Sequence, residues 1–138
     1  MHKNYNIHKS AGIIIKERKL LIERSVGKDF FISPGGSIER GETPKVALVR
    51  ELMEEFTIRV LTSELKEFGV FYAEAVNNPG NVVRMEVFFV NHWEGEIIPS
   101  GEVEEIFWVT SNIPQKLKIG TIFAHDVIPK LKNMELID

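Results

Sequence analysis

Residues 36–58 read Gly-Ser-Ile-Glu-Arg-Gly-Glu-Thr-Pro-Lys-Val-Ala-Leu-Val-Arg-Glu-Leu-Met-Glu-Glu-Phe-Thr-Ile. The Thr43-Pro44 pair predicts the start of a helix, because threonine is a favoured N-cap and proline suits the first helical position. Apolar residues then recur at helical spacing as far as Phe56. We therefore expect a helix over 43–56, just after the Pro-Gly-Gly loop at 34–36.

Three glutamates, Glu51, Glu54 and Glu55, lie on one face of this predicted helix, because positions i, i+3 and i+4 are neighbours. Their carboxylates repel one another at pH 7 unless a positive charge lies between them. A divalent cation that prefers oxygen ligands is the simplest candidate. A solvated acidic face is the alternative for three glutamates alone.

Short aliphatic or β-branched runs flank this helix and predict strands. A Pro- and Gly-containing loop over 77–81 predicts a hairpin, and a helical pattern returns at 126–134, where Pro129 is tolerated only near the first turn. The order of elements predicts an α/β fold, an α/β/α sandwich with a mixed β-sheet between two helices. The predicted strands are 11–15, 19–22, 30–32, 65–76, 82–93 and 106–109, with the first two as a hairpin or successive strands.

Composition sets the outer limits on function. A chain of 138 residues predicts a single domain over 1–138, and the net charge of −3 predicts no nucleic-acid partner. The absence of cysteine excludes disulfides, thiolate zinc sites and cysteine nucleophiles. A polar N-terminus without a signal pattern, and no apolar run of membrane-spanning length, predict a cytoplasmic protein with no membrane partner.

The 36–58 stretch resembles the Nudix box, Gly-x5-Glu-x7-Arg-Glu-U-x-Glu-Glu-x-Gly-U, in which U is a bulky aliphatic residue. Seven of the eight positions constrained before the final aliphatic residue match, and segments 20–24, 34–36 and 108–109 are similar to those of MutT-like Nudix proteins. The resemblance implies the Nudix-type sandwich. The matching residues are Gly36, Glu42, Arg50, Glu51, Leu52, Glu54 and Glu55, and Ile58 closes the motif.

One box position departs from the pattern: Thr57 stands where the family has glycine. Helices often end in a left-handed residue, which costs a residue with a side chain roughly 1–2 kcal/mol. We expect either that Thr57 bears this strain or that the helix ends differently. If Thr57 is left-handed, Thr57→Gly is expected to be neutral or stabilising.

The resemblance implies a reaction. Nudix enzymes hydrolyse a nucleoside diphosphate linked to a group X, at a phosphoanhydride bond, by water activated by Mg²⁺ or Mn²⁺. By this resemblance the metal ligands are Glu51, Glu54, Glu55 and the Gly36 carbonyl.

The resemblance also implies roles for residues around these ligands. Arg50 holds a box glutamate by a salt bridge, Glu42 supports the metal site through other groups or water, and Gly35 allows close backbone approach to the substrate. The general base is Glu51 or Glu102, with Glu104 and Glu105 as less favoured substitutes.

Further residues are candidates for contact with the substrate, but each can also be explained as a surface, capping or core residue. Arg24 resembles a phosphate-contacting arginine but equally a surface residue, and His125 lies where some relatives have the base but a lone histidine is more often a cap. An aromatic side chain is expected to stack on the nucleobase. The candidates are Phe30, Phe71, Tyr72, Phe88, Phe89 and Trp93.

The short chain and MutT-like layout favour a nucleoside triphosphate or related nucleotide, cleaved to a monophosphate and pyrophosphate. ADP-ribose, a nucleotide sugar or a dinucleoside polyphosphate is the alternative substrate. A non-catalytic nucleotide-sensing module is the alternative class, which retention of the box glutamates disfavours. A homodimer is compatible with the family.

Overall fold

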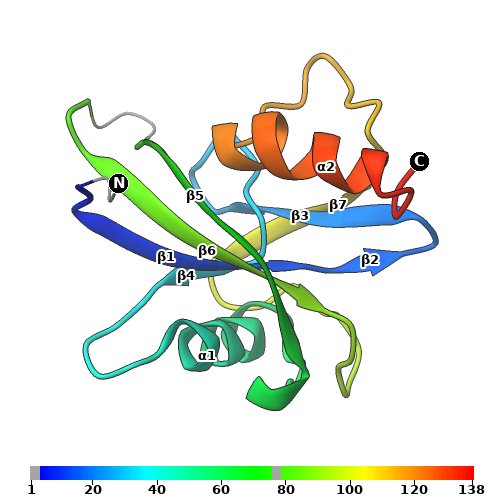
Figure 1. Ribbon diagram of the computed structural model, residues 1–138. Helices are drawn as coiled ribbons and strands as arrows, with labels where there is room; N and C mark the ends of the chain where they lie inside the picture. The colour runs from blue at the N-terminus through cyan, green and yellow to red at the C-terminus, as the bar shows by residue number, and fades with distance from the viewer. Residues whose placement is uncertain (1–3, 76–78) are drawn as a thin grey trace.

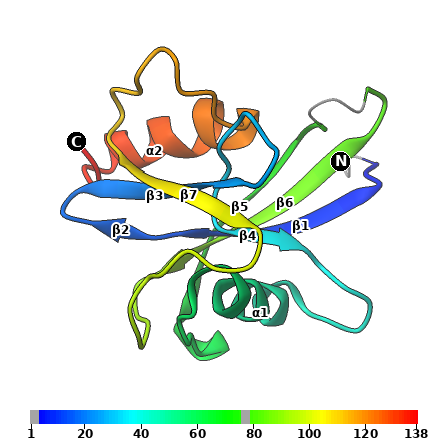
Figure 2. The same ribbon diagram turned by 180° about the vertical axis from the view of Figure 1, so that it is seen from behind.

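The computed structural model describes residues 4–75 and 79–138. Helices α1 (Pro44–Phe56) and α2 (Ile128–Asn133) lie on opposite sides of the strands (Figures 1 and 2). The predicted α/β sandwich between two helices is therefore confirmed. The strands within the described residues are divided between two sheets, where one mixed sheet was expected.

The larger sheet has the order β4-β1-β6-β5. Its strands are β1 (Ile7–Ile13), β4 (Gly35–Ser37), β5 (Leu65–Glu74) and β6 (Val82–Val90). β1 pairs parallel to β6 and antiparallel to β4, and β5 pairs antiparallel to β6, so this sheet is mixed as predicted. The hairpin predicted between 65–76 and 82–93 is confirmed, although residues 76–78 of its connection lie outside the described residues.

The smaller, antiparallel sheet consists of β2 (Ile15–Lys16), β3 (Lys19–Ser25) and β7 (Val103–Val109). The hairpin predicted around residues 16–18 is present, with Ile15 opposite Leu20. The single strand predicted over 11–15 is divided at Ile14, because the chain passes there from the larger sheet into the smaller one.

The strand predicted over 30–32 is wrong as an independent element. Ile32 and Phe31 form isolated bridges, to Glu23 and Ile119 respectively, and the remaining backbone is irregular. The segment thus lies beside β3 without extending the sheet.

Two apolar cores hold the helices to the strands. The α1 core combines helix residues Leu48, Leu52 and Phe56 with strand residues that include Leu21 and Phe88. The α2 core joins apolar residues of the C-terminal helical segment to the opposite faces of β1, β3 and β6. Since both helices are packed on the strands, the backbone of α1 is fixed against the sheet, and the side chains outside its core lie at the edge of the sandwich.

The C-terminal helical segment begins earlier than predicted. A π-helical turn, η2 (Phe123–Val127), precedes α2, and the Ile128 N–H donates to the Phe123 carbonyl five residues back. Pro129 lies in the first turn of α2, as expected for a residue without an N–H. A short 3-10 turn, η1 (Thr62–Glu64), precedes β5. No helix in the described residues is long and apolar enough to cross a membrane.

Candidate active site

Local signals at its N-terminus and packing on one face orient α1. Thr43 has extended dihedral angles (φ −81°, ψ 162°), and its side chain accepts a hydrogen bond from the Val46 N–H at 3.2 Å, so the predicted N-cap is confirmed. Ala47, Leu48, Leu52 and Phe56 are buried on the sheet side. The charged side chains of α1 lie on the flank beside this buried face: Glu54 is exposed, whereas Arg50, Glu51 and Glu55 are half-buried.

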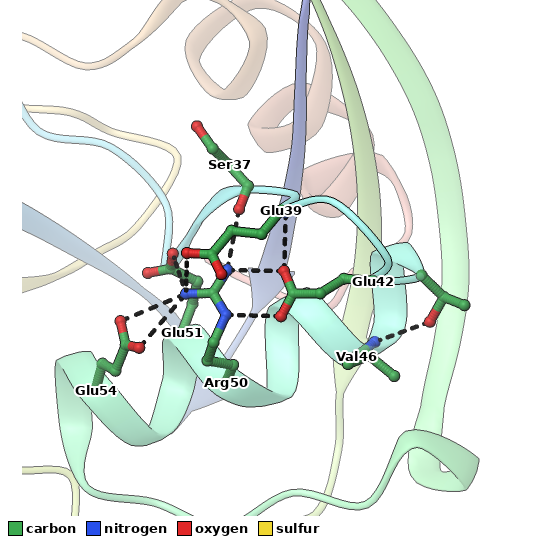
Figure 3. A network of polar contacts seen from close by, with 8 residues as sticks. Ser37, Glu39, Glu42, Val46, Arg50, Glu51 and Glu54 are labelled. Carbon is green, nitrogen blue, oxygen red and sulfur yellow. Dashed lines mark hydrogen bonds and ion pairs between the residues drawn. The ribbon is translucent and has the colours of Figure 1, made fainter.

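Arg50 is the centre of the polar network on this helix (Figure 3). Its Nε and Nη2 donate to the two oxygens of Glu42 at 2.7 and 2.9 Å, in the parallel arrangement that suits a guanidinium and a carboxylate. Nη2 also donates to the Ser37 carbonyl at 3.1 Å. The Arg50 guanidinium, with the Glu39 N–H, lowers the pKa of Glu42. The guanidinium is thereby fixed against the loop that precedes the helix.

The same guanidinium contacts two of the box glutamates. Arg50 Nη1 lies 3.0 Å from a Glu51 oxygen and 3.5 Å from Glu54 (Figure 3). In this conformation Arg50 supplies a positive charge between these two carboxylates. Among the residues that the structure describes, no three His, Cys, Asp or Glu side chains are grouped closely enough to hold a metal ion.

The Pro-Gly-Gly segment predicted as a loop over 34–36 enters strand β4 at Gly35, and its two glycines allow the carboxylates to approach the backbone. A Cβ at Gly36 would lie 2.6 Å from the Glu51 carboxylate, so any larger residue would push that carboxylate out of its present position. Gly35 has φ +135°, and a Cβ there would lie 2.1 Å from the Ser10 carbonyl. The Gly35 N–H donates to Glu55 Oε1 at 3.0 Å, which ties the start of β4 to α1.

A fourth glutamate, Glu23 on β3, joins this cluster and was not predicted. Glu23 is fully buried (0% exposed), and within the described residues no hydrogen-bond donor reaches either of its side-chain oxygens. Burial first, then the charge of Glu55, a hydrogen bond that the protonated Glu23 can donate to Glu55, and the charge of Glu51 raise the pKa of Glu23 far above the usual range of a carboxyl group. The available sequence signal was a single acidic residue directly after the buried run Leu20–Ile22.

Burial also raises the pKa of Glu55, to about 7, and that of Glu51, while the guanidinium of Arg50 opposes the rise at Glu51. Buried carboxylates are costly without a compensating cation or proton. The donor set is entirely oxygen, which Mg²⁺ and Mn²⁺ prefer. By the chemistry of their donor atoms, although not by a ready-made grouping in this conformation, these residues therefore suit a divalent cation.

The loop before β7, over residues 99–102, packs against the C-terminal half of α1. The Ser100 N–H donates to the Glu55 carbonyl at 2.8 Å, and a Cβ at Gly101 would lie 3.2 Å from the Glu54 carbonyl. Glu102 follows with an exposed side chain, so the fold brings the predicted alternative base to the neighbourhood of the helix glutamates.

Arg24, the candidate phosphate contact, is engaged with the same region. Its guanidinium donates to Glu104 and Glu105, at 3.0 Å in each case, and to the Lys28 carbonyl. His125 is exposed on η2. The structure therefore places Arg24 beside the two glutamates at the start of β7, and His125 on the helical turn η2 that precedes α2.

A cleft of about 420 Å³ opens on the α2 side of the larger sheet. Ser33 lines it, two residues before the Gly35 that binds Glu55. Among the aromatic candidates, Phe30 lines this cleft, whereas Phe88 is buried in the α1 core. The others lie in or against the cores (Phe71, Phe89, Trp93) or bond to Arg84 (Tyr72).

The family model of the NUDIX domain matches residues 6–131. The chain belongs to the Nudix family. It is a MutT-like Nudix hydrolase, and the predicted enzyme class is confirmed. The chain is 41% identical over 109 residues to an 8-oxo-dGTP diphosphatase of Haemophilus influenzae, which covers 75% of each chain.

A second curated relative and a solved structure are also similar to this Nudix hydrolase. It is 32% identical over 123 residues to an ADP-ribose pyrophosphatase of Methanocaldococcus jannaschii, covering 86% of this chain and 68% of the relative. Among solved structures, a MutT from a comparison of the Aliivibrio salmonicida and Vibrio cholerae proteins superimposes with a TM-score of 0.71 and 25% identity. That match covers 93% of this chain and 98% of the other.

Proposed function

We propose that this Nudix hydrolase cleaves a nucleoside triphosphate to the monophosphate and pyrophosphate. The observation that carries the proposal is that one short segment joins the cleft to the carboxylates. Ser33 lines the cleft, and Gly35 binds Glu55. A ligand whose nucleoside lies in the cleft would direct its phosphates along this loop toward α1. The cleft is also within the usual size range of small-molecule sites.

Mg²⁺ or Mn²⁺ would be held by Glu51, Glu54, Glu55 and the Gly36 carbonyl. When bound, such a cation neutralises phosphate charge and lowers the pKa of water. Arg50, fixed by Glu42, orients Glu51 and Glu54 through the contacts described above.

The chain's own carboxylates supply the base in this proposal. Either Glu51 or Glu102 takes the proton from the attacking water, which then attacks phosphorus as the phosphoanhydride bond breaks. The raised pKa of Glu51, caused first by burial, makes it a stronger proton acceptor than an exposed glutamate. Arg24 would contact phosphate only after exchanging its bonds to Glu104 and Glu105.

Phe30 provides an aromatic surface in the cleft for the nucleobase. The similarity to the Haemophilus influenzae protein supports a purine deoxynucleoside triphosphate such as 8-oxo-dGTP. The similarity to the Methanocaldococcus jannaschii protein supports ADP-ribose as the second candidate. Both substrates carry the pyrophosphate that the carboxylate cluster would act on, and they differ in the group X.

The test is hydrolysis of dGTP, 8-oxo-dGTP and ADP-ribose with Mg²⁺ or Mn²⁺. We expect Glu54→Gln to lower kcat by about two decades or more, and the exposed Glu64→Gln to match the wild type. Phe30→Ala is expected mainly to raise KM for the preferred substrate, because it removes a stacking surface remote from the reacting phosphorus. Absence of metal-dependent turnover of every nucleotide by the wild type would contradict the proposal.

The homodimer, the cytoplasmic location and the single domain over 1–138 stay predictions.

A further inference from the structure

Glu23 is held rigidly in the centre of the smaller sheet. Its backbone exchanges two hydrogen bonds with Ile32, each of 2.8 Å, and it lies opposite Ile106 in the pairing of β3 with β7. A residue bonded on both sides cannot turn its side chain to the other face of the sheet. The position of the Glu23 carboxyl group is therefore determined by the fold.

That position faces α1. Leu21, two residues earlier on β3, belongs to the α1 core, whereas Leu20 and Ile22 belong to the α2 core. Because side chains alternate along a strand, Glu23 points to the same side as Leu21. There it meets Glu55 and Glu51, the two neighbouring charges that affect it.

A purely structural role explains this arrangement poorly. A buried carboxylate is normally compensated by hydrogen-bond donors or a positive charge, and no donor within the described residues reaches Glu23. Its charged neighbours, Glu55 and Glu51, are themselves acidic, so they increase the cost. An apolar residue of similar volume would fill the same space without this penalty.

We propose that Glu23 belongs to the cation site, binding the divalent cation together with Glu55 from the β3 side. The family's box supplies glutamates from α1, and Glu23 adds a carboxylate from the sheet beneath that helix. The cation provides the positive charge that the structure otherwise lacks at this point. This inference rests on the proposed use of a divalent cation at the same site, but not on the identity of the nucleotide.

The experiment measures binding of Mn²⁺ alone, by the loss of the free-ion EPR signal, to wild type and Glu23→Gln. The amide keeps the size of the side chain and can donate to Glu55, so the metal-free variant is expected to melt at or above the wild-type temperature. We expect its Mn²⁺ dissociation constant to rise by about tenfold or more, or one bound ion to be lost. Glu86→Gln is the matched control, because Glu86 is a largely buried carboxylate of β6 that contacts His8.

If Glu23→Gln binds Mn²⁺ with the same affinity and stoichiometry as the wild type, the proposal is overturned. Glu23→Leu provides a second measurement if the amide alters folding, since it fills the cavity without donating or accepting hydrogen bonds. A folded Glu23→Leu that binds Mn²⁺ as the wild type does would also overturn it. Because the assay contains no nucleotide, its result is independent of whether the wild type hydrolyses any member of the substrate panel.

Discussion

Replacing Thr57 by glycine tests how α1 ends. Thr57 has left-handed dihedral angles (φ 58°, ψ 27°), and its N–H donates to the Met53 carbonyl at 3.0 Å, which closes the last turn. The family's box has glycine at this position, and glycine adopts this conformation without a clash. Of the two outcomes expected from the sequence, the structure shows the strained one.

The net effect follows from three contributions. Removing the side chain relieves roughly 1–2 kcal/mol of left-handed strain. Glycine loses about 0.4–1 kcal/mol of this gain through the greater freedom of the unfolded chain. The 3.4 Å hydrogen bond from Thr57 Oγ1 to the Glu96 carbonyl is long and exposed, so its loss costs about 0.5 kcal/mol or less. These contributions sum to between about −0.5 and +1.5 kcal/mol, so we expect a small net stabilisation of about 0.5 kcal/mol, or a rise in melting temperature of about 2 °C.

The assay compares thermal and urea unfolding of wild type, Thr57→Gly and Thr62→Gly. Thr62 is also exposed but is not among the residues with positive φ, so glycine there is expected to destabilise by roughly 0.5–1 kcal/mol. Opposite signs at the two positions would show that the backbone conformation, and not glycine itself, decides the result. A loss of more than about 1 kcal/mol in Thr57→Gly would refute the assignment of strain to Thr57.

Two further predictions concern the charges on α1. Arg50→Lys is expected to lower kcat by about 10- to 100-fold, because an ammonium cannot reproduce the two parallel bonds to Glu42 together with the contact to Glu51. In steady-state assays the exposed Arg59→Lys is the control, and equal rates for both variants would contradict the orienting role. Stability should also depend on pH in EDTA. Burial raises the pKa of Glu55 from 4.5 to about 7, so the folded state binds more protons than the unfolded state, and stability should fall as pH rises from about 4.5 to 7. The melting temperature of Glu55→Gln should fall less steeply with pH across this range than that of the wild type. An equal pH dependence of the two melting temperatures would argue against the raised pKa of Glu55.

The box helix could be predicted from sequence because its determinants are local. Thr43 and Pro44 act within one turn of the helix start, and the spacing of Arg50, Glu51 and Glu54 places them together on any α-helix. The same local spacing identified the family, and therefore the class of reaction. These parts of the site depend on residues within a few turns of one another.

Other parts depended on contacts between distant segments. The division of 11–15 between two sheets follows from the pairing of β1 with β6 and of β2 with β3, which no local pattern specifies. The choice of Phe30 for the cleft similarly depends on how its loop lies against the larger sheet and η2. Periodicity identifies an apolar residue but does not state which segment will cover it.

Glu23 shows the difference most clearly. The sequence by itself determined that α1 carries a cluster of glutamates, since helical geometry alone brings Glu51, Glu54 and Glu55 to one face. Only the tertiary structure decided that a fourth carboxylate, 32 residues away from Glu55 along the chain, is buried against them. The physical reason is that strand pairing with Ile32 and Ile106 fixes the direction of the Glu23 side chain, and both partners come from separate segments.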